Sequence, residues 1–257
     1  VHFLDAQVRI VNHLAASPVS TYFQRYLLNH DGEEVTRFWK GDSEYFLRIL
    51  TYLEGEFYVD HAGKSPALAA ELGDMLGRMD LALRDFSHPA MHRRYTWDIS
   101  TALDARARVK YIKDPERRRM AGHFLMQFEV EVAPVLSSLR HAYIHNDAND
   151  WNVLVRDGHI AGLIDFGDMV HSALINNVAV ACTYVMLGRD EPLTDAAALV
   201  GSYHARYPLH PEELRILYWL IAGRLCISVT QSAFNGAKDS DNEHHFITER
   251  PAWNLLH

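Results

Sequence analysis

The sequence is poor in cysteine and in positive charge. Its 257 residues include two cysteines, Cys182 and Cys226, both inside apolar stretches that we expect to be helical. Reduced core thiols are therefore expected rather than a disulfide, which favours a cytoplasmic location. The 25 Lys and Arg residues are outnumbered by 33 Asp and Glu, so the formal net charge is −8. This balance argues against a nucleic-acid partner, because phosphate backbones require clustered Lys and Arg.

Long apolar runs, internal repeats and low-complexity tracts are also lacking. The longest apolar run, residues 172–187, is interrupted by Asn176 and Asn177 and is too short to span a bilayer. The first residues carry Asp5 and Arg9 in an amphipathic pattern, which is not typical of a signal peptide. The sequence therefore predicts a chain without a membrane partner. No pattern in it indicates an oligomeric state.

A polar loop between two apolar strands carries the clearest chemistry. Residues 145–152 read H-N-D-A-N-D-W-N, with apolar residues before and after them. The turn Asp157-Gly158 follows, and a second apolar strand leads into Asp165. Pairing of the strands around that turn would bring Asn152 and Asp165 to the same end, where their oxygens could share one metal ion. Asp147 would face an incoming hydroxyl, as phosphoryl transfer requires.

Other readings of the loop are weaker. A polar turn with capping Asp and Asn side chains would explain an isolated H-x-D, but not the whole series of strand, loop, hairpin and second carboxylate. His141 and His145 have the spacing of a helical zinc site but lack its Glu, and they lie in a strand-like stretch. The loop fails the calcium-loop pattern, and no G-x-S-x-G elbow of a serine hydrolase occurs.

The first part of the chain reads as one helix and a small antiparallel sheet. A helix is expected over residues 4–16, followed by a strand over 21–29 and a hairpin turn at His30-Asp31-Gly32. Residues 35–39 would be the return strand, and 45–53 a further strand. We predict a partial N-terminal lobe over residues 1–55.

The remainder, residues 56–257, reads as a mainly helical lobe, so the fold class is α+β. Helices are expected over residues 67–83, 173–187 and 194–207, after Asp114-Pro115, and from His210 onward. Gly73 and Gly77 lie four apart on the first of these, which indicates close helix packing. The lobe boundary is placed in residues 55–65.

Together, the loop and the Ile164-Asp165-Phe166-Gly167-Asp168-Met169 stretch resemble the aminoglycoside phosphotransferase and choline kinase family, which has a bilobal protein-kinase-like fold. The resemblance implies ATP or GTP and Mg²⁺ as cofactors, Asp147 as the catalytic residue, and Asn152 and Asp165 as metal ligands. It gives His145 a mainly structural role.

The resemblance also covers looser motifs. Residues Thr51, Tyr52 and Leu53 resemble the hinge whose backbone receives adenine. Within the family, the sequence looks most like the hydroxylysine kinase branch and its bacterial relatives, some of which are fused to aminotransferases. A longer fusion protein is therefore one expectation.

One departure from the family pattern concerns the start of the chain. No Gly-rich loop followed by a strand Lys precedes the first helix, and the chain begins with Val. Either the first strands are missing from this sequence, or the protein is a noncatalytic kinase-like module that supports a fused or partner enzyme. We favour missing strands, because the catalytic loop retains every required group.

The acceptor site is predicted from four further residues near the loop. Asn149 and Trp151 would line it, and Trp97 would be either its wall or an anchoring aromatic. Asp168 would either hold a cationic group or cap a helix beginning near Ser172. A small-molecule acceptor that carries an amine fits this acidic site.

Arg224 completes the predicted set. It lies on the apolar face of its helix, and a buried guanidinium requires an anionic partner. That partner would be a protein carboxylate or the carboxylate of the acceptor. Acidic residues together with an Arg would suit a hydroxylated amino acid, and the sequence therefore predicts a small-molecule kinase.

Overall fold

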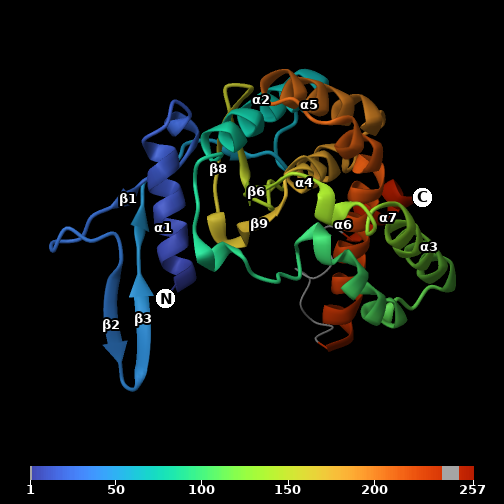
Figure 1. Ribbon diagram of the computed structural model, residues 1–257, viewed down its shortest axis with the longest axis horizontal. Helices are drawn as coiled ribbons and strands as arrows, with labels where there is room; N and C mark the ends of the chain where they lie inside the picture. Colours follow the sequence, from blue (N-terminus) through green and yellow to red (C-terminus); the bar gives the residue numbers. More distant parts are fainter. Residues whose placement is uncertain (1, 239–248) are drawn as a thin grey trace.

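The computed structural model describes residues 2–238 and 249–257. Figure 1 shows α1 and the strands β1 to β3 on one side of the molecule, and the helices α2 to α7 packed together on the other. The N-terminal elements are α1 (His2–Ala15), η1 (Ser20–Tyr22), β1 (Tyr26–Leu27), β2 (Thr36–Lys40), β3 (Ser43–Leu47), β4 (Ile49–Leu50) and β5 (Glu56–Phe57). The middle elements are α2 (Pro66–Ala82), η2 (Pro89–Met91), η3 (Ile99–Tyr111), α3 (Pro115–Glu131), η4 (Leu136–Ser138), β6 (His141–Ile144), β7 (Val153–Arg156), β8 (His159–Leu163), η5 (Phe166–Asp168) and β9 (Val170–Ala173). The last helices are α4 (Ile175–Met186), α5 (Pro192–Arg206), α6 (Pro211–Lys238) and α7 (Glu249–Leu256).

The strand pairing in the N-terminal part differs from the prediction. The expected hairpin at residues 30–32 is wrong: β2 pairs with β3 around Gly41, whose φ of +62° suits a tight turn, and β1 pairs with β4. Asn29 explains the error, because its side-chain oxygen accepts the backbone N–H groups of Asp31 and Glu33 and closes a local loop there. The expected strand over residues 45–53 is divided between β3 and β4.

Two glycines allow α2 and α5 to pack closely. A Cβ on Gly73 of α2 would lie 2.1 Å from the backbone oxygen of Leu199 in α5, and one on Gly77 would lie 3.0 Å from Cβ of Arg206. The prediction of close packing at these glycines is confirmed. The start of α3 is confirmed as well, because Asp114 accepts the backbone N–H groups of the first turn.

Two small sheets support the polar loop. The predicted hairpin at Asp157-Gly158 is confirmed: β7 and β8 are antiparallel, and β5 pairs with the other edge of β7. β6 pairs with β9, so the strand before the loop lies beside the strand that follows Asp168. Because Ser172 and Ala173 belong to β9 and α4 begins at Ile175, the expected helix start at residue 173 is wrong by two residues. The division into lobes at residues 1–55 and 56–257 stays a prediction.

The core runs through the helical part. Cys182 and Cys226 are buried and free, as predicted. By length and composition α6 could cross a membrane, but 61% of its most apolar window is buried inside the structure, as in the core helix of a globular protein. α6 also carries the buried charge of Arg224.

Candidate active site

The loop between β6 and β7 is closed by its own polar groups. The backbone oxygen of Asn149 accepts the N–H groups of Asn152 and Val153, each at 3.1 Å, and its side chain accepts the N–H of Trp151 at 2.8 Å. Asn149 was predicted to contact the acceptor, but these bonds give it a role in shaping the loop. Ile164 N–H donates to the Asn152 backbone oxygen at 2.9 Å, which places Asp165 next to Asn152 across the hairpin.

Asp147 is held by donors from two directions. The side-chain amide of Asn152 donates to its backbone oxygen at 2.9 Å and to Oδ2 at 2.8 Å. Arg224 donates to Oδ1 at 3.0 Å. The carboxylate is therefore fixed in orientation, while each oxygen retains a further lone pair for a hydroxyl donor.

His145 supports the loop through both of its ring nitrogens. It is fully buried, Nε2 donates to the Ile164 oxygen at 3.1 Å, and Nδ1 accepts the backbone N–H of Asp147 at 3.3 Å. Burial lowers the pKa of His145 to about 4, so the ring is neutral, as one donor and one acceptor nitrogen require. Both nitrogens are used, which removes His145 from the zinc alternative.

Asn152 and Asp165 have the donor chemistry for a divalent cation. The Asn152 nitrogen is used by Asp147, which leaves its amide oxygen as the ligand atom. Asp165 has φ +61° and its Oδ1 accepts Gly167 N–H at 3.0 Å, which leaves Oδ2. Among the described residues no group of three or more His, Cys, Asp and Glu could hold a metal. A site of one amide and one carboxylate fits magnesium, which keeps phosphate and water ligands.

Arg93 and Gln7 fix the turn that carries Asp165. Arg93 donates to the backbone oxygens of Gly167 at 2.9 Å and Met169 at 3.0 Å. Gln7 of α1 donates to the Phe166 oxygen at 3.1 Å and accepts from Arg48 at 2.8 Å. Neither contact is visible in the sequence, because each joins residues far apart in the chain.

Asp168 does not cap a helix. Its Oδ1 accepts the hydroxyl of Tyr95, and α4 begins at Ile175 without a side-chain cap. Burial raises the pKa of Asp168, although the Tyr95 hydrogen bond and the charge of Arg224 act in the opposite direction. The prediction left two roles open, and the cap is excluded. The Tyr95 ring already has the Arg93 guanidinium 4.2 Å from its centre, so the Asp168 carboxylate is the group that remains for a cationic ligand.

Arg224 and Trp97 come together at the catalytic loop. Arg224 donates to the Trp97 backbone oxygen at 2.8 Å, and its guanidinium lies 5.0 Å from the centre of the Trp97 ring. Of the two anionic partners that the sequence left open, the structure places a protein carboxylate, Asp147, on Arg224. The Trp97 ring thus packs against the guanidinium, as an anchoring aromatic would, and its role in the acceptor wall stays a prediction. Trp151 is instead 41% exposed, and its ring centre lies 5.7 Å from that of Phe57.

The predicted hinge follows β4. Thr51 N–H donates to the Arg25 oxygen at 2.8 Å, and the Thr51 oxygen accepts from the Gln24 side chain at 2.9 Å. Both main-chain groups of Thr51 are thus used within the chain. Tyr52 is 84% exposed, and Leu53 packs against Gly162, so these two residues fit base recognition better.

A buried polar network supports the loop and was not predicted. Asn177 accepts the N–H of Asn146, whose φ is +66°, at 3.1 Å and donates to Asp80 at 3.0 Å. Tyr203 donates to the same carboxylate at 2.7 Å. Burial raises the pKa of Asp80 to about 7. The signal in the sequence was the pair Asn176-Asn177 in an apolar helix, since buried amides require partners.

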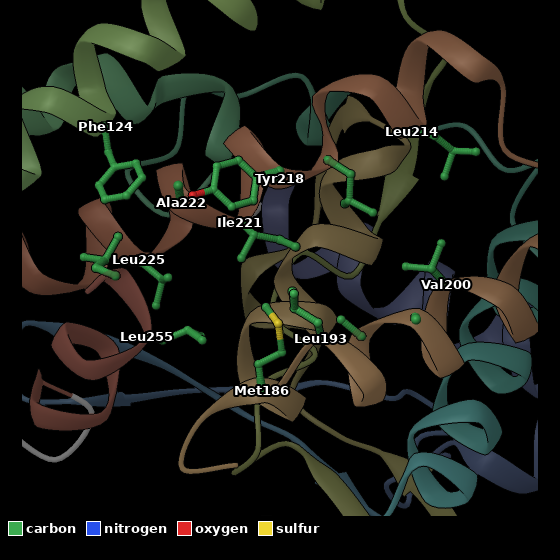
Figure 2. A pocket seen from close by; sticks show the side chains of 14 residues that line it. Phe124, Met186, Leu193, Val200, Leu214, Tyr218, Ile221, Ala222, Leu225 and Leu255 are labelled. Carbon is green, nitrogen blue, oxygen red and sulfur yellow. The ribbon is translucent and has the colours of Figure 1, made fainter. Parts of the chain in front are cut away.

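An apolar pocket of about 370 Å³ lies elsewhere, among α3 to α7. Figure 2 shows its lining, in which the Tyr218 hydroxyl is the one polar group among the labelled side chains. None of the predicted site residues lines it. It lacks the charges that a triphosphate requires, so the catalytic loop remains the candidate active site.

A small N-terminal part joined to a larger helical part, with an Asp, an Asn and a second Asp at the ends of paired strands, defines a protein of the protein-kinase-like fold. The chain belongs to the phosphotransferase enzyme family, whose model matches residues 3–217. Among solved structures, an amicoumacin kinase in complex with AMP-PNP, Ca²⁺ and Ami is similar, with a TM-score of 0.71 and 14% identity over 99% of this chain and 77% of that one. This similarity concerns the fold alone.

Two curated relatives are similar in sequence. The hydroxylysine kinase of Danio rerio is 28% identical over 82% of this chain and 62% of its own length. The homoserine kinase of Methylobacillus flagellatus is 33% identical over 58% of this chain and 45% of its own length. The chain thus spans about six tenths of the hydroxylysine kinase that it matches.

Proposed function

We propose that this protein transfers the terminal phosphate of ATP to the hydroxyl group of a small, amine-bearing molecule. The observation that carries the proposal is the juxtaposition of Asn152 and Asp165 beside an oriented Asp147. Family membership and the kinases among its relatives support it.

The residues divide the work as follows. Asp147 accepts a hydrogen bond from the acceptor hydroxyl and turns its oxygen toward the terminal phosphorus of ATP. It receives the hydroxyl proton as the new oxygen–phosphorus bond forms and the bond from that phosphorus to the bridging oxygen breaks, so that ADP leaves. Asn152 and Asp165 would hold Mg²⁺, which would neutralise the negative charge of the triphosphate. His145 and Asn152 keep the loop in this geometry.

Nucleotide and metal use are supported by the fold comparison. The amicoumacin kinase structure contains AMP-PNP and Ca²⁺. In this chain, Tyr52 and Leu53 lie between β4 and β5, where their backbone would receive the base. Magnesium is proposed over calcium because the two protein ligands suit an ion that retains water and phosphate ligands.

The acceptor class follows from the charges at the loop. Asp168 accepts a hydrogen bond from the Tyr95 hydroxyl and lies near the charge of Arg224, but among the described residues it forms no ion pair with a cation. An ammonium group would complete this carboxylate. The relatives include a hydroxylysine kinase and a homoserine kinase, and a hydroxylated amino acid is therefore the proposed acceptor.

The remaining expectations concern the cellular setting. The buried free thiols of Cys182 and Cys226 support a reducing, cytoplasmic location. The noncatalytic alternative is not favoured, because the relatives are named as kinases and the loop has every required group.

The proposal is tested with the full-length protein and a panel of hydroxylated amines and amino acids. Release of nucleoside diphosphate from ATP or GTP is measured with magnesium and with a chelator. We expect acceptor-dependent release that requires the metal and prefers acceptors with an ammonium group. Absence of both this release and magnesium-dependent nucleotide binding would overturn the proposal, and tightly bound zinc would support a metal hydrolase instead.

A further inference from the structure

Arg224 carries a buried charge for which the reaction itself has no direct use. Its side chain is 2% exposed, so it is not presented to an acceptor molecule. Moving a guanidinium from water into such an interior is unfavourable unless it is paired with an anion and hydrogen-bonded. Its one ion pair in the described part of the chain is with Asp147. The charge is therefore committed to the candidate catalytic residue.

The guanidinium is held in one orientation by its surroundings. Arg224 donates to the backbone oxygen of Trp97 at 2.8 Å and to the hydroxyl of Tyr184 at 3.2 Å. It lies 5.0 Å from the centre of the Trp97 ring and 5.6 Å from that of Tyr184, both within cation–π range. Contacts to two rings and two oxygens leave Arg224 no freedom to swing toward a ligand.

Asp147 is constrained as a consequence. Arg224 occupies one side of Oδ1, and Asn152 occupies one side of Oδ2. These donors come from α6 and from the end of the loop, so two separate parts of the chain fix the plane of the carboxylate. Only the remaining lone pairs can meet a hydroxyl.

We propose that Arg224 is a positioning residue for Asp147, and that it acts on the rate of phosphate transfer rather than on acceptor binding. The proposal rests on the proposed kinase function. It replaces the interpretation of Arg224 as a clamp for an acceptor carboxylate. Misplacement of a reacting group by about 1 Å can reduce a rate by about 100-fold, which sets the expected size of the effect.

The test compares Arg224→Met, Arg224→Lys and Tyr184→Phe with the wild type in the full-length protein. For Arg224→Met we expect kcat to fall about 100-fold, with the acceptor KM changed by less than about threefold. Arg224→Lys retains the charge but not the planar guanidinium that joins Asp147 to Trp97 and Tyr184, so it should recover kcat in part, to about tenfold below the wild type. Tyr184→Phe removes one hydrogen bond to the guanidinium and should lower kcat about threefold to tenfold.

Arg140→Met is the matched control, because Arg140 forms a partly buried ion pair with Glu213 at 2.6 Å without contact to Asp147. Its kcat should equal that of the wild type. Thermal unfolding identifies variants that do not fold. If Arg224→Met is among them, the kcat values of Arg224→Lys and Tyr184→Phe test the positioning role.

Three results would overturn the positioning role: an acceptor KM raised tenfold or more at unchanged kcat, a kcat within about threefold of wild type in Arg224→Met, or no recovery in a folded Arg224→Lys. An inactive wild type would instead remove the proposed function, and with it the step that Arg224 serves. The two failures are thus distinguishable.

Discussion

The side-chain amide of Asn152 donates to Oδ2 of Asp147 at 2.8 Å, so a candidate metal ligand and the candidate catalytic carboxylate touch directly. One amide thereby has two tasks, since its nitrogen orients Asp147 and its oxygen is left for a cation. Substitutions of Asp147 and of the metal ligands are therefore expected to change different quantities: the rate of transfer at Asp147 and the binding of nucleotide with metal at Asp165.

Replacement of Asp147 by Asn should abolish transfer while nucleotide binding persists. The amide is isosteric but cannot receive the proton of the acceptor hydroxyl, so kcat should fall by about 10³-fold. Isothermal titration with ATP and magnesium should give an affinity close to that of the wild type, because Asp147 is not assigned as a metal ligand. More than a tenth of wild-type kcat in a folded Asp147→Asn variant would refute its role.

Replacement of Asp165 by Asn should remove the metal dependence of nucleotide binding. Loss of the one carboxylate in the predicted pair weakens a magnesium site, and we expect affinity for ATP with magnesium to fall to about the level measured with a chelator. The control is Asp157→Asn in the exposed β7–β8 turn, where φ is +53° and Asn is tolerated. Equal magnesium dependence in both variants would contradict the assignment of Asp165.

Replacement of Asp168 by Asn should weaken the binding of amine-bearing acceptors. If the carboxylate pairs with an ammonium group, the acceptor KM should rise about tenfold or more, with little change in the KM for ATP. Asp104→Asn is the control, because Asp104 is paired with exposed Arg94 at the surface. An Asp168 variant whose KM rises equally for acceptors with and without an amine would disprove ammonium recognition.

The pH dependence of stability should report Asp80. Its pKa of about 7 lies above the value of 3.8 for an unburied Asp, so the folded state binds more protons in this interval. Its contribution to stability is therefore complete below pH 3.8 and is lost as the pH rises through 7. His145, with a pKa lowered to about 4, acts in the opposite sense: its contribution is present above pH 6.5 and is lost as the pH falls through 4.

In the wild type these two contributions largely offset each other between pH 4 and pH 6.5. The His145 contribution is common to the wild type and to Asp80→Asn, so the difference in their free energies of unfolding reflects the loss of the Asp80 contribution alone. The free energy of unfolding of the variant, relative to wild type, should therefore rise with pH by up to about 4 kcal/mol between pH 4 and pH 7. Urea titrations at several pH values measure this difference. An unchanged difference across the range would show that Asp80 titrates normally.

Two glycine substitutions, one at the contact between α2 and α5 and one away from it, should have opposite effects on stability. In Gly73→Ala the new methyl group would meet the Leu199 oxygen at 2.1 Å, so the helices must separate, at a cost of about 2–4 kcal/mol. Gly201→Ala on α5 meets no atom within 4 Å and should gain up to about 1 kcal/mol from helix propensity. Denaturant midpoints of the two variants measure this, and similar values would be inconsistent with the close contact.

Local patterns predicted the parts of the site that lie close in the chain. The hairpin at Asp157-Gly158 is a turn between apolar runs, and it alone brings Asn152 and Asp165 together. The pairing of β1 with β4 was missed because the Asn29 side chain, rather than strand periodicity, directs the chain there.

Contacts between distant residues could be predicted only in part. The burial of Arg224 followed from its apolar helix face, which required an anion without specifying which one. Its partner Asp147 is 77 residues away, and the Tyr95 partner of Asp168 is 73 residues away. No periodicity links such positions, so only the three-dimensional structure assigns them.

Gln7 of α1 links the turn that carries Asp165 to the N-terminal strands, because its side-chain amide contacts both the Phe166 oxygen and Arg48. The placement of α1 and the geometry of the turn at Asp165 are therefore energetically linked. By reciprocity, a ligand that binds at this turn and favours its geometry should also stabilise the placement of α1, and a change that displaces α1 should weaken that binding by the same free energy. A change in the placement of α1 is thus expected to alter binding at Asp165, the predicted metal ligand.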